Sequence, residues 1–471
     1  MIRSLPAPLA LAPLLLGVSG CTVGPDYERP ETTIAENWLE PAVPGPVDAD
    51  WWSSFGDAQL ASLIERAIAS SPDLREAEAR LAEARANRDA ARGGRLPQVE
   101  AAGSATENVL SENGQLPVGA IPGFDRQFSL FDLGFDASWE LDFWGRNRRQ
   151  IEAAEARADA ALWGRRDALV SLVAELARNY VELRGAQAEL AAAEEQVAAR
   201  AELARLTGLL FDAGETSRIE AEQAESQRAA VAAVRDGLAA QAAAAAYRIA
   251  VLVGDPPEDV VPALRESSPI PEPPSTIVSG VRSELLERRP DIRRAERELA
   301  AATADIGVAT ADLFPRFSLL GSVGLQAREP GDLLSESSGR VMVGPSFSWP
   351  IFSGGRIRAR IRGADARAEG AAARYDRAVI GALAESESAA NRFANATSAA
   401  AEASAALERE TQAYRLTEMR VEQGEDDRLA LMRARLRMAE AQSRERNAAE
   451  ARTTAAVALY KALGGGWDAA P

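Results

Sequence analysis

The 471-residue chain contains no histidine and only one cysteine. Histidine is the commonest general base and the commonest metal ligand, so its absence excludes Ser-His and Cys-His mechanisms. One cysteine forms neither a disulfide within the chain nor a cysteine zinc site. Carboxylate pairs remain possible, but no such pair and no nucleophile stands out. We therefore expect a protein that is not an enzyme and that uses no cofactor or metal.

Aromatic residues make up only 6% of the chain, and 53 Lys and Arg residues face 70 Asp and Glu residues, a formal net charge of −17. Nucleic-acid binding needs a basic surface, so this balance argues against it. The chain is instead rich in alanine, interspersed with glutamate, arginine and leucine. These residues favour helix because they lose little side-chain entropy in it.

The single cysteine ends a secretory signal. Met1-Ile2-Arg3 gives a positive start, an apolar stretch follows from Leu9 to Val18, and small residues lead to Cys21. This order predicts a signal peptide over residues 1–20. Val18-Ser19-Gly20-Cys21 resembles the lipobox of bacterial lipoproteins, which implies cleavage before Cys21 and acylation of that residue. The alternative is an ordinary signal peptide with an incidental cysteine. Because Thr22 rather than aspartate follows, we expect a lipid-anchored protein of the outer membrane.

Two copies of one pattern organise the rest of the chain. Ser71-Pro72-Asp73-Leu74-Arg75 returns as Arg289-Pro290-Asp291-Ile292-Arg293, and later Pro, Trp and Gly positions match in order. Each copy predicts a helix, two strands and a long helical hairpin. The predicted domains are a lipid-anchored segment at 21–56, a first repeat at 57–254, a linker at 255–276, a second repeat at 277–464 and a C-terminal tail at 465–471.

Strict alternation of apolar and polar residues predicts strands in each repeat. It runs over residues 131–143 and 341–351, and less cleanly over 98–106 and 317–326. Membrane strands alternate in this way between lipid and lumen, although an antiparallel sheet covering a soluble core does so too. The best helical candidate for a membrane span, 239–254, is too short and contains Arg248. We therefore expect strands to cross the membrane. Four strands cannot close a barrel, so the chain must oligomerise.

Two proline-free runs, from Arg146 to about Leu210 and from Arg356 to about Gln423, predict very long helices. Each run turns at a glycine, Gly214 or Gly424, and is followed by a shorter helix. Such helices, rich in small residues, pack as coiled coils.

These features resemble the outer-membrane factor lipoproteins of the TolC/OprM-like (NodT-type) efflux family. The resemblance rests on Cys21-Thr22-Val23-Gly24-Pro25-Asp26-Tyr27, on Trp51-Trp52-Ser53-Ser54-Phe55-Gly56-Asp57, and on the ending Leu459-Tyr460-Lys461-Ala462-Leu463-Gly464-Gly465-Gly466-Trp467. It implies a mainly α fold with a membrane β-barrel portion. In the implied homotrimer, each chain gives four strands to a shared twelve-stranded barrel. Coiled-coil helices then form an α-barrel in the periplasm.

The resemblance also implies the channel subunit of a tripartite efflux system. Such a subunit is a passive exit duct for small toxic compounds or drugs, delivered by an inner-membrane resistance-nodulation-division pump through a periplasmic adaptor (membrane fusion) protein. A type I protein-secretion duct or a metal-ion efflux duct of the same family is the alternative. A soluble periplasmic adaptor or scaffold is disfavoured, because this chain has two duplicated hairpins and only four strands.

Candidate site residues lie at the two hairpin turns. The stretch 211–217 resembles the family's periplasmic tip, where the adaptor docks, and the resemblance assigns docking to Phe211, Gly214, Thr216, Ser217 and Gly424. The second turn departs from the pattern and carries Glu425, Asp426 and Asp427. We predict that these three form an acidic gate at the aperture. The alternative is that they only cap the helix that begins at Arg428.

A second candidate site is the polar face of the strand over 131–143. Four acids are predicted to face the lumen and to favour cations: Asp132, Asp136, Glu140 and Asp142. The alternative is a solvated strand face. Trp139 and Trp349 are expected to be anchors at the membrane interface.

Overall fold

The computed structural model describes residues 22–31, 34–35, 37–41, 43–111 and 125–467. The predicted signal peptide and Cys21 lie outside the described residues. The chain divides into two compact units. Unit 1 comprises residues 1–30, 82–159 and 296–374, and unit 2 comprises residues 31–81, 160–295 and 375–471. Each predicted repeat therefore contributes to both units, and the domain boundaries drawn from the sequence stay a prediction.

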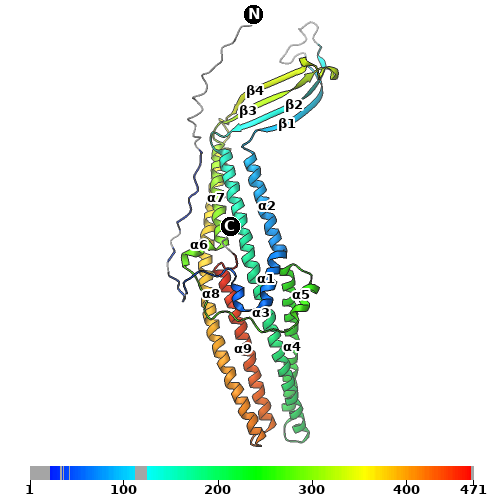
Figure 1. The fold of residues 1–471 in the computed structure, drawn as a ribbon, viewed down its shortest axis with the longest axis vertical. Coiled ribbons are helices and arrows are strands. Elements are labelled where there is room, and N and C mark those ends of the chain that lie inside the picture. The colour runs from blue at the N-terminus through cyan, green and yellow to red at the C-terminus, as the bar shows by residue number, and fades with distance from the viewer. Residues whose placement is uncertain (1–21, 32–33, 36, 42, 112–124, 468–471) are drawn as a thin grey trace. The chain divides into compact units, whose positions relative to one another are not determined.

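The same order of elements occurs twice along the chain (Figure 1). The first series is α2 (Pro72–Gly93), β1 (Gln98–Val109), β2 (Gln127–Leu141), α3 (Arg146–Asp212) and α4 (Arg218–Val253). The second is α7 (Pro290–Ala311), β3 (Arg316–Ala327), β4 (Gly339–Ser348), α8 (Arg356–Glu422) and α9 (Arg428–Ala462). The predicted series of a helix, two strands and a long helical hairpin is confirmed.

Several shorter elements were not foreseen. The predicted linker over 255–276 contains a helix, α5 (Pro257–Leu264), so it is not a plain connection. The others are α1 (Ala58–Ser70), α6 (Leu285–Arg288) and the 3-10 turns η2 (Trp51–Phe55), η4 (Arg282–Glu284), η5 (Pro330–Asp332) and η6 (Glu336–Ser338).

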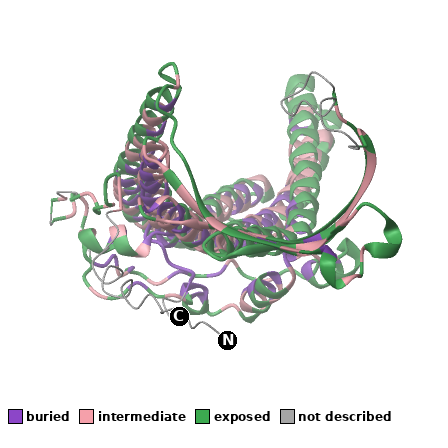
Figure 2. Cartoon of the chain, turned by 90° about the horizontal axis from the view of Figure 1, so that it is seen from above, coloured by how far each residue is buried: buried purple, intermediate pink, exposed green. Residues whose placement is uncertain are grey.

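The four strands of unit 1 form one antiparallel sheet in the order β1-β2-β3-β4. In the described chain β1 and β4 each pair on one side only. Large apolar side chains remain exposed on one face of the sheet, including Val99 at 64%, Phe135 at 57% and Val341 at 78%. Figure 2 shows the contrast, since buried residues gather along helices whereas the strands are intermediate or exposed. Within one chain the sheet thus has open edges and a bare apolar face.

Indole groups tie the strands to the ends of helices in unit 1. Trp139 Nε1 donates a hydrogen bond to the carbonyl of Arg95 at 2.9 Å, and Trp349 Nε1 donates to the carbonyl of Leu313 at 3.0 Å. These two pairs occupy matching positions of the two repeats. Buried and half-buried indoles need such a partner for their N–H group. The two predicted anchors therefore fix the junction between helix and strand in both copies.

An aromatic cluster occupies the core of unit 2. Trp51 is only 1% exposed and stacks on Tyr460 at a centroid distance of 5.0 Å, with Trp52 and Phe55 in edge contact. Gly465 approaches the same indole so closely that a Cβ atom there would lie 3.1 Å from Trp51 Cδ1. Two segments on which the family resemblance rests thus pack against each other, although they lie at opposite ends of the chain.

Helix α4 is long and apolar enough, by length and composition alone, to cross a membrane. The core helix of a soluble protein meets the same criterion. Ala245, Ile249 and Val253 of α4 are fully buried in the core of unit 2. Their burial explains the apolar character of α4 as packing against other helices.

One carboxyl group in unit 2 sits where helices α3 and α9 approach each other. A Cβ atom at Gly185 of α3 would lie 2.0 Å from Glu450 Oε2 of α9, so the glycine makes room for this side chain. Burial, and then the nearby Glu182 and Glu189, raise the pKa of Glu450 to about 7. Arg248 pairs with Glu182 at 2.6 Å, and Ser443 donates to Glu189 at 2.7 Å.

The raised pKa predicts a stability that depends on pH. The folded chain binds more protons at Glu450 than the unfolded chain between the ordinary carboxyl pKa and about 7, so this contribution to stability is lost as pH rises through 7. Glu450→Gln should therefore stabilise the protein at pH 8 by about 1–2 kcal/mol, allowing for solvent screening, and by little at pH 5. Urea unfolding at both pH values checks this. Equal effects at the two values would contradict it.

Candidate functional site

The two hairpin turns of unit 2 have the same backbone design. Gly214 and Gly424 adopt positive φ angles of 77° and 72°. Just beyond them, the N–H of Glu215 donates to the carbonyl of Leu210 at 2.8 Å, and that of Glu425 donates to the carbonyl of Arg420 at 2.9 Å. This six-to-one bond after a left-handed glycine is the Schellman ending of a helix. Both glycines, predicted as tip residues, therefore serve the chain reversal itself.

At the first turn, two predicted docking residues take part in capping α4. Ser217 Oγ accepts from the N–H of Glu220 at 3.3 Å, and the Glu220 carboxylate accepts from the N–H of Ser217 at 3.3 Å and from the Thr216 hydroxyl. This is a capping box. Phe211 is different, because its side chain is 41% exposed. Of the predicted docking residues, Phe211 alone offers a large apolar surface.

At the second turn, each of the three predicted gate acids has a partner. Asp427 Oδ1 accepts from the N–H of Ala430 at 2.7 Å and caps α9, as the alternative reading expected. Arg420 Nε lies 3.0 Å from Asp426 Oδ2 and 3.7 Å from Glu425 Oε2. Arg420 was not predicted, since its only signal in the sequence is its position one turn before the glycine. The turn is thus less acidic than its sequence suggests.

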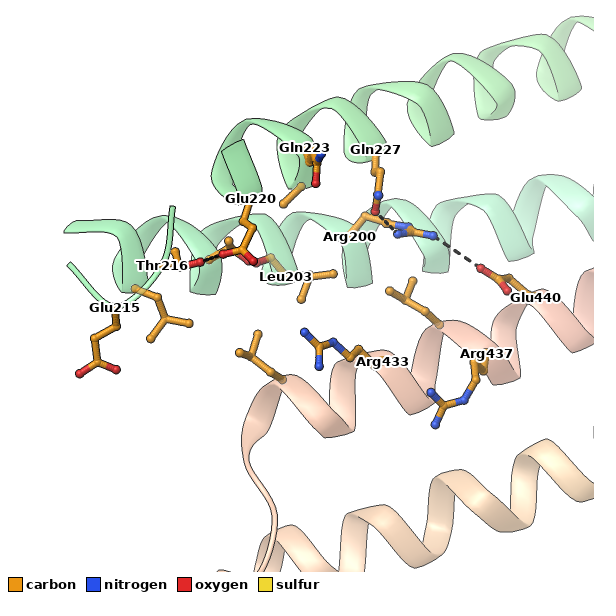
Figure 3. Close-up of a pocket in the computed structure, with 15 residues that line it drawn as sticks. Arg200, Leu203, Glu215, Thr216, Glu220, Gln223, Gln227, Arg433, Arg437 and Glu440 are labelled. Atoms are coloured by element: carbon orange, nitrogen blue, oxygen red, sulfur yellow. Dashed lines mark hydrogen bonds and ion pairs between the residues drawn. The ribbon is translucent and has the colours of Figure 1, made fainter. Parts of the chain in front are cut away.

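A groove of about 650 Å³ runs beside the turns between α3, α4 and α9. Figure 3 shows Arg200, Arg433 and Arg437 along it, with Glu215 and Glu220 toward the turn. Arg200 pairs with Glu440 of α9 at 3.5 Å, which links the two hairpins. The groove mixes these charges with leucine side chains such as Leu203.

The polar face of the sheet in unit 1 contains a charge pair. Asp132 of β2 receives hydrogen bonds from Arg340 Nε at 3.1 Å and Nη2 at 2.7 Å, and from Gln326 at 2.8 Å. Gly324 lies opposite both Gly134 and Arg340 in the strand register. Because neither glycine has a side chain, the guanidinium can extend from β4 across β3 to reach Asp132. Arg340 was missed in the sequence because no local pattern marks it.

The other three predicted lumen acids differ from Asp132. Asp136 lies opposite Glu100, and Glu140 lies opposite Ser318. Asp142 lies one residue beyond β2, which ends at Leu141. Its carboxylate instead accepts from the N–H groups of Asn147 at 3.0 Å and Arg148 at 2.9 Å, at the start of α3. The free N–H groups of a helix start attract a carboxylate more strongly than a strand face does.

The sequence pattern described as "outer membrane efflux protein" matches residues 63–255 and 281–465. The chain belongs to this outer membrane efflux protein family. It is 32% identical over 471 residues to the pyoverdine export outer membrane protein OpmQ of Pseudomonas aeruginosa, covering 98% of this chain and 96% of that one. It is 31% identical over 468 residues to the outer membrane protein OprJ of the same organism, covering 97% and 95%.

Solved structures agree with this membership. The outer-membrane channel OprN is similar with a TM-score of 0.84 and 37% identity, over 95% of this chain and 100% of that one. The open state of the Neisseria gonorrhoeae MtrE outer membrane channel gives a TM-score of 0.82 and 29% identity, over 95% and 98%. This efflux protein is thus the outer-membrane channel of a tripartite efflux system and extends into the periplasm. Its fold is that of a trimeric channel, mainly α, with four membrane strands per chain.

The second turn of the efflux protein allows the cap and the gate roles of Asp427 to be separated. Asp427→Asn keeps a side-chain oxygen for the cap but removes the charge, whereas Asp427→Ala removes both. If the residue is only a cap, Asp427→Ala should destabilise α9 by about 1 kcal/mol, and Asp427→Asn should resemble wild type. Thermal unfolding and single-channel conductance in lipid bilayers check this. A similar rise in resting conductance in both variants would instead support the gate.

The pair between Asp132 and Arg340 predicts opposite changes of ion selectivity. Arg340→Gln should leave the Asp132 carboxylate without its cation and increase the preference for cations, because fixed negative charge on a lumen wall attracts them. Asp132→Asn should shift the preference toward anions. Reversal potentials across a salt gradient measure both. Shifts in the same direction, or none in either variant, would show that this face does not line the ion path.

Proposed function

We propose that this channel is the passive exit duct for small toxic organic compounds or drugs, which an inner-membrane pump of the resistance-nodulation-division type delivers through a periplasmic adaptor. The chain itself then performs no chemistry, and the pump supplies the energy. The roles of the duct and of its partners are those that the family resemblance implies. Docking of an adaptor is supported by the two similar hairpin turns of this chain, which lie beside a groove of about 650 Å³.

Small molecules as cargo are supported by the relatives. An antibiotic efflux pump outer membrane protein, ArpC of Pseudomonas putida, and a toluene efflux pump outer membrane protein, TtgC of the same species, are each 30% identical over 98% of this chain. Antibiotics, toluene and pyoverdine share little chemistry. A duct that serves such different compounds in related proteins does not need a specific pocket for each. A polar lumen face suits that role.

Docking at the turns is supported by Phe211, which exposes 41% of its surface next to the capped start of α4. An exposed aromatic side chain at a rigid turn is a good anchor for a partner, because aromatic residues bury much area at little entropic cost. The arginine and glutamate side chains of the groove add a polar rim. An exposed aromatic side chain beside a groove with a polar rim suits the helical hairpin of an adaptor better than a flat surface would.

Dye accumulation in cells tests the proposal. A strain that lacks this chain and other ducts of its family should accumulate dye, and plasmid-borne wild type should reverse the accumulation. Phe211→Ala should restore efflux poorly, because it weakens docking. Tyr247→Ala is the matched control, since this aromatic residue is 51% exposed on α4 away from the turn. Wild-type protein that fails to lower accumulation would contradict small-molecule cargo and favour a protein or metal-ion duct.

A further inference from the structure

The stretch Thr22–Tyr27, called the arm here, lies in a fitted groove of unit 1. The N–H of Val23 donates to the carbonyl of Trp144 at 3.1 Å. Arg149 makes three further bonds to the arm. Its Nε donates to the carbonyl of Val23 at 3.2 Å, and its Nη2 donates to the carbonyl of Gly24 at 3.2 Å and to Asp26 Oδ1 at 2.6 Å. The Arg149 side chain is only 3% exposed. The buried guanidinium therefore binds the arm mainly at its backbone carbonyls.

Glycine residues bring the arm into direct backbone contact with the groove. Gly24 has a φ of 89°, and a Cβ atom there would lie 2.4 Å from Gly307 Cα of α7. A Cβ atom at Gly307 would lie 2.7 Å from Arg149 Cγ. Gly145 faces Thr22 in the same way, because a Cβ atom at Gly145 would lie 2.7 Å from Thr22 Cγ2. A larger residue at any of these three positions would force its neighbours to shift.

The far end of the arm is held by a side chain. The Tyr27 hydroxyl donates to Glu296 Oε1 at 3.1 Å, and the Arg297 guanidinium lies 5.4 Å from the centre of the tyrosine ring. We call the groove the seat and define it by Trp144, Gly145, Arg149, Glu296 and Gly307. Residues of α3 and α7 thus hold the arm together, and these helices come from different repeats.

The repeat shows that two central residues of the seat serve the arm. By the alignment of the two copies, Ala359 is the counterpart of Arg149, and Asp89 is the counterpart of Gly307. Packing that the repeats share therefore requires neither the arginine nor the glycine. Arg149 stands in the first copy and Gly307 in the second, and neither residue recurs at the matching position of the other copy. The twofold pattern of the chain is broken at the place where a single N-terminus must fit.

We propose that the seat is a binding site for the processed N-terminus of this same chain, and that it holds the lipid-bearing end at the junction between strands and helices. Trp144 and Gly145 lie between the end of β2 and the start of α3, and Trp144 Nε1 donates to the carbonyl of Pro315 just before β3. The exposed rings of Phe143 and Phe347 lie at the same end of the sheet, both in contact with Phe317.

The membrane-anchoring part of this inference requires that Cys21 is acylated. Acyl chains attached one residue before the arm enter the membrane beside these aromatic side chains, which prefer the interface. With the arm bound in the seat, the lipid anchor holds the channel at a fixed depth in the membrane. An arm that is not bound there would connect the lipid to the channel only through a flexible segment.

Hydrogen exchange of the full-length trimer in detergent tests the seat. The Val23 amide should exchange slowly in wild type. It should exchange about tenfold or more faster in Arg149→Ala, which removes three hydrogen bonds to the arm. The same increase is expected in Gly24→Ala, whose added methyl group prevents the arm from approaching Gly307. Arg157→Ala is the matched control. Arg157 lies on the same helix and pairs with Asp305 of α7 but makes no bond to the arm. It should leave Val23 protected.

Two further measurements keep the test decisive. Amides of α9 around Tyr460 act as an internal standard, so faster exchange confined to the arm separates its release from unfolding. Cys21→Ser, exported behind an ordinary signal peptide that is cleaved before residue 21, should keep Val23 protected, because the seat binds the peptide rather than the lipid. Unchanged protection in Arg149→Ala and Gly24→Ala would overturn the proposal. Loss of protection in Cys21→Ser equal to that in Arg149→Ala would overturn it as well, since the lipid would then hold the arm.

Discussion

Backbone groups that enter a lipid bilayer must all be hydrogen-bonded, and this constraint determines how the chain is used. Its four-stranded sheet leaves the outer edges of β1 and β4 without partners within one chain. Open edges are not tolerated in lipid, so they must pair with neighbouring chains. The exposed apolar side chains of the same sheet, such as Val341, are then explained as the lipid-facing surface. A trimer closes the barrel, and the other face of the sheet lines a lumen.

Local ion pairs and caps modify the strongly acidic character of the chain at its functional surfaces. Asp132 is paired with Arg340 on the polar face of the sheet, and Asp426 is paired with Arg420 at the second turn. Asp142 and Asp427 cap helices. A carboxylate that accepts several hydrogen bonds contributes to structure first, and its effect on passing ions is reduced. The net charge of −17 therefore overstates the negative field along the path.

The fold was predictable where the sequence has a strong period or clear breaks. The alternation over 131–143 placed β2 within a few residues, and the proline-free runs predicted α3 and α8 because glycine and proline mark their ends. The duplication strengthened each assignment, since two copies had to agree. Helix α5 was missed because its prolines suggested a linker, although Pro256 and Pro257 stand at its start, where proline is tolerated.

The candidate sites were less predictable, because their partners are far apart in the sequence. Nothing near Asp132 indicates that Arg340 reaches it across two glycines. Likewise, the motif Cys21 to Tyr27 was recognised only as a resemblance. Its contacts with Arg149 and Gly307 depend on how α3 and α7 pack, which local patterns do not specify.

One chain cannot form the channel, and closure of the barrel requires three. Native mass spectrometry of the protein extracted from outer membranes, combined with conductance of the same sample in lipid bilayers, tests it most directly. We expect three chains in every conducting complex and no conductance from separated chains. A single chain that inserts and conducts by itself would contradict it, because its two open sheet edges would then be stable in lipid.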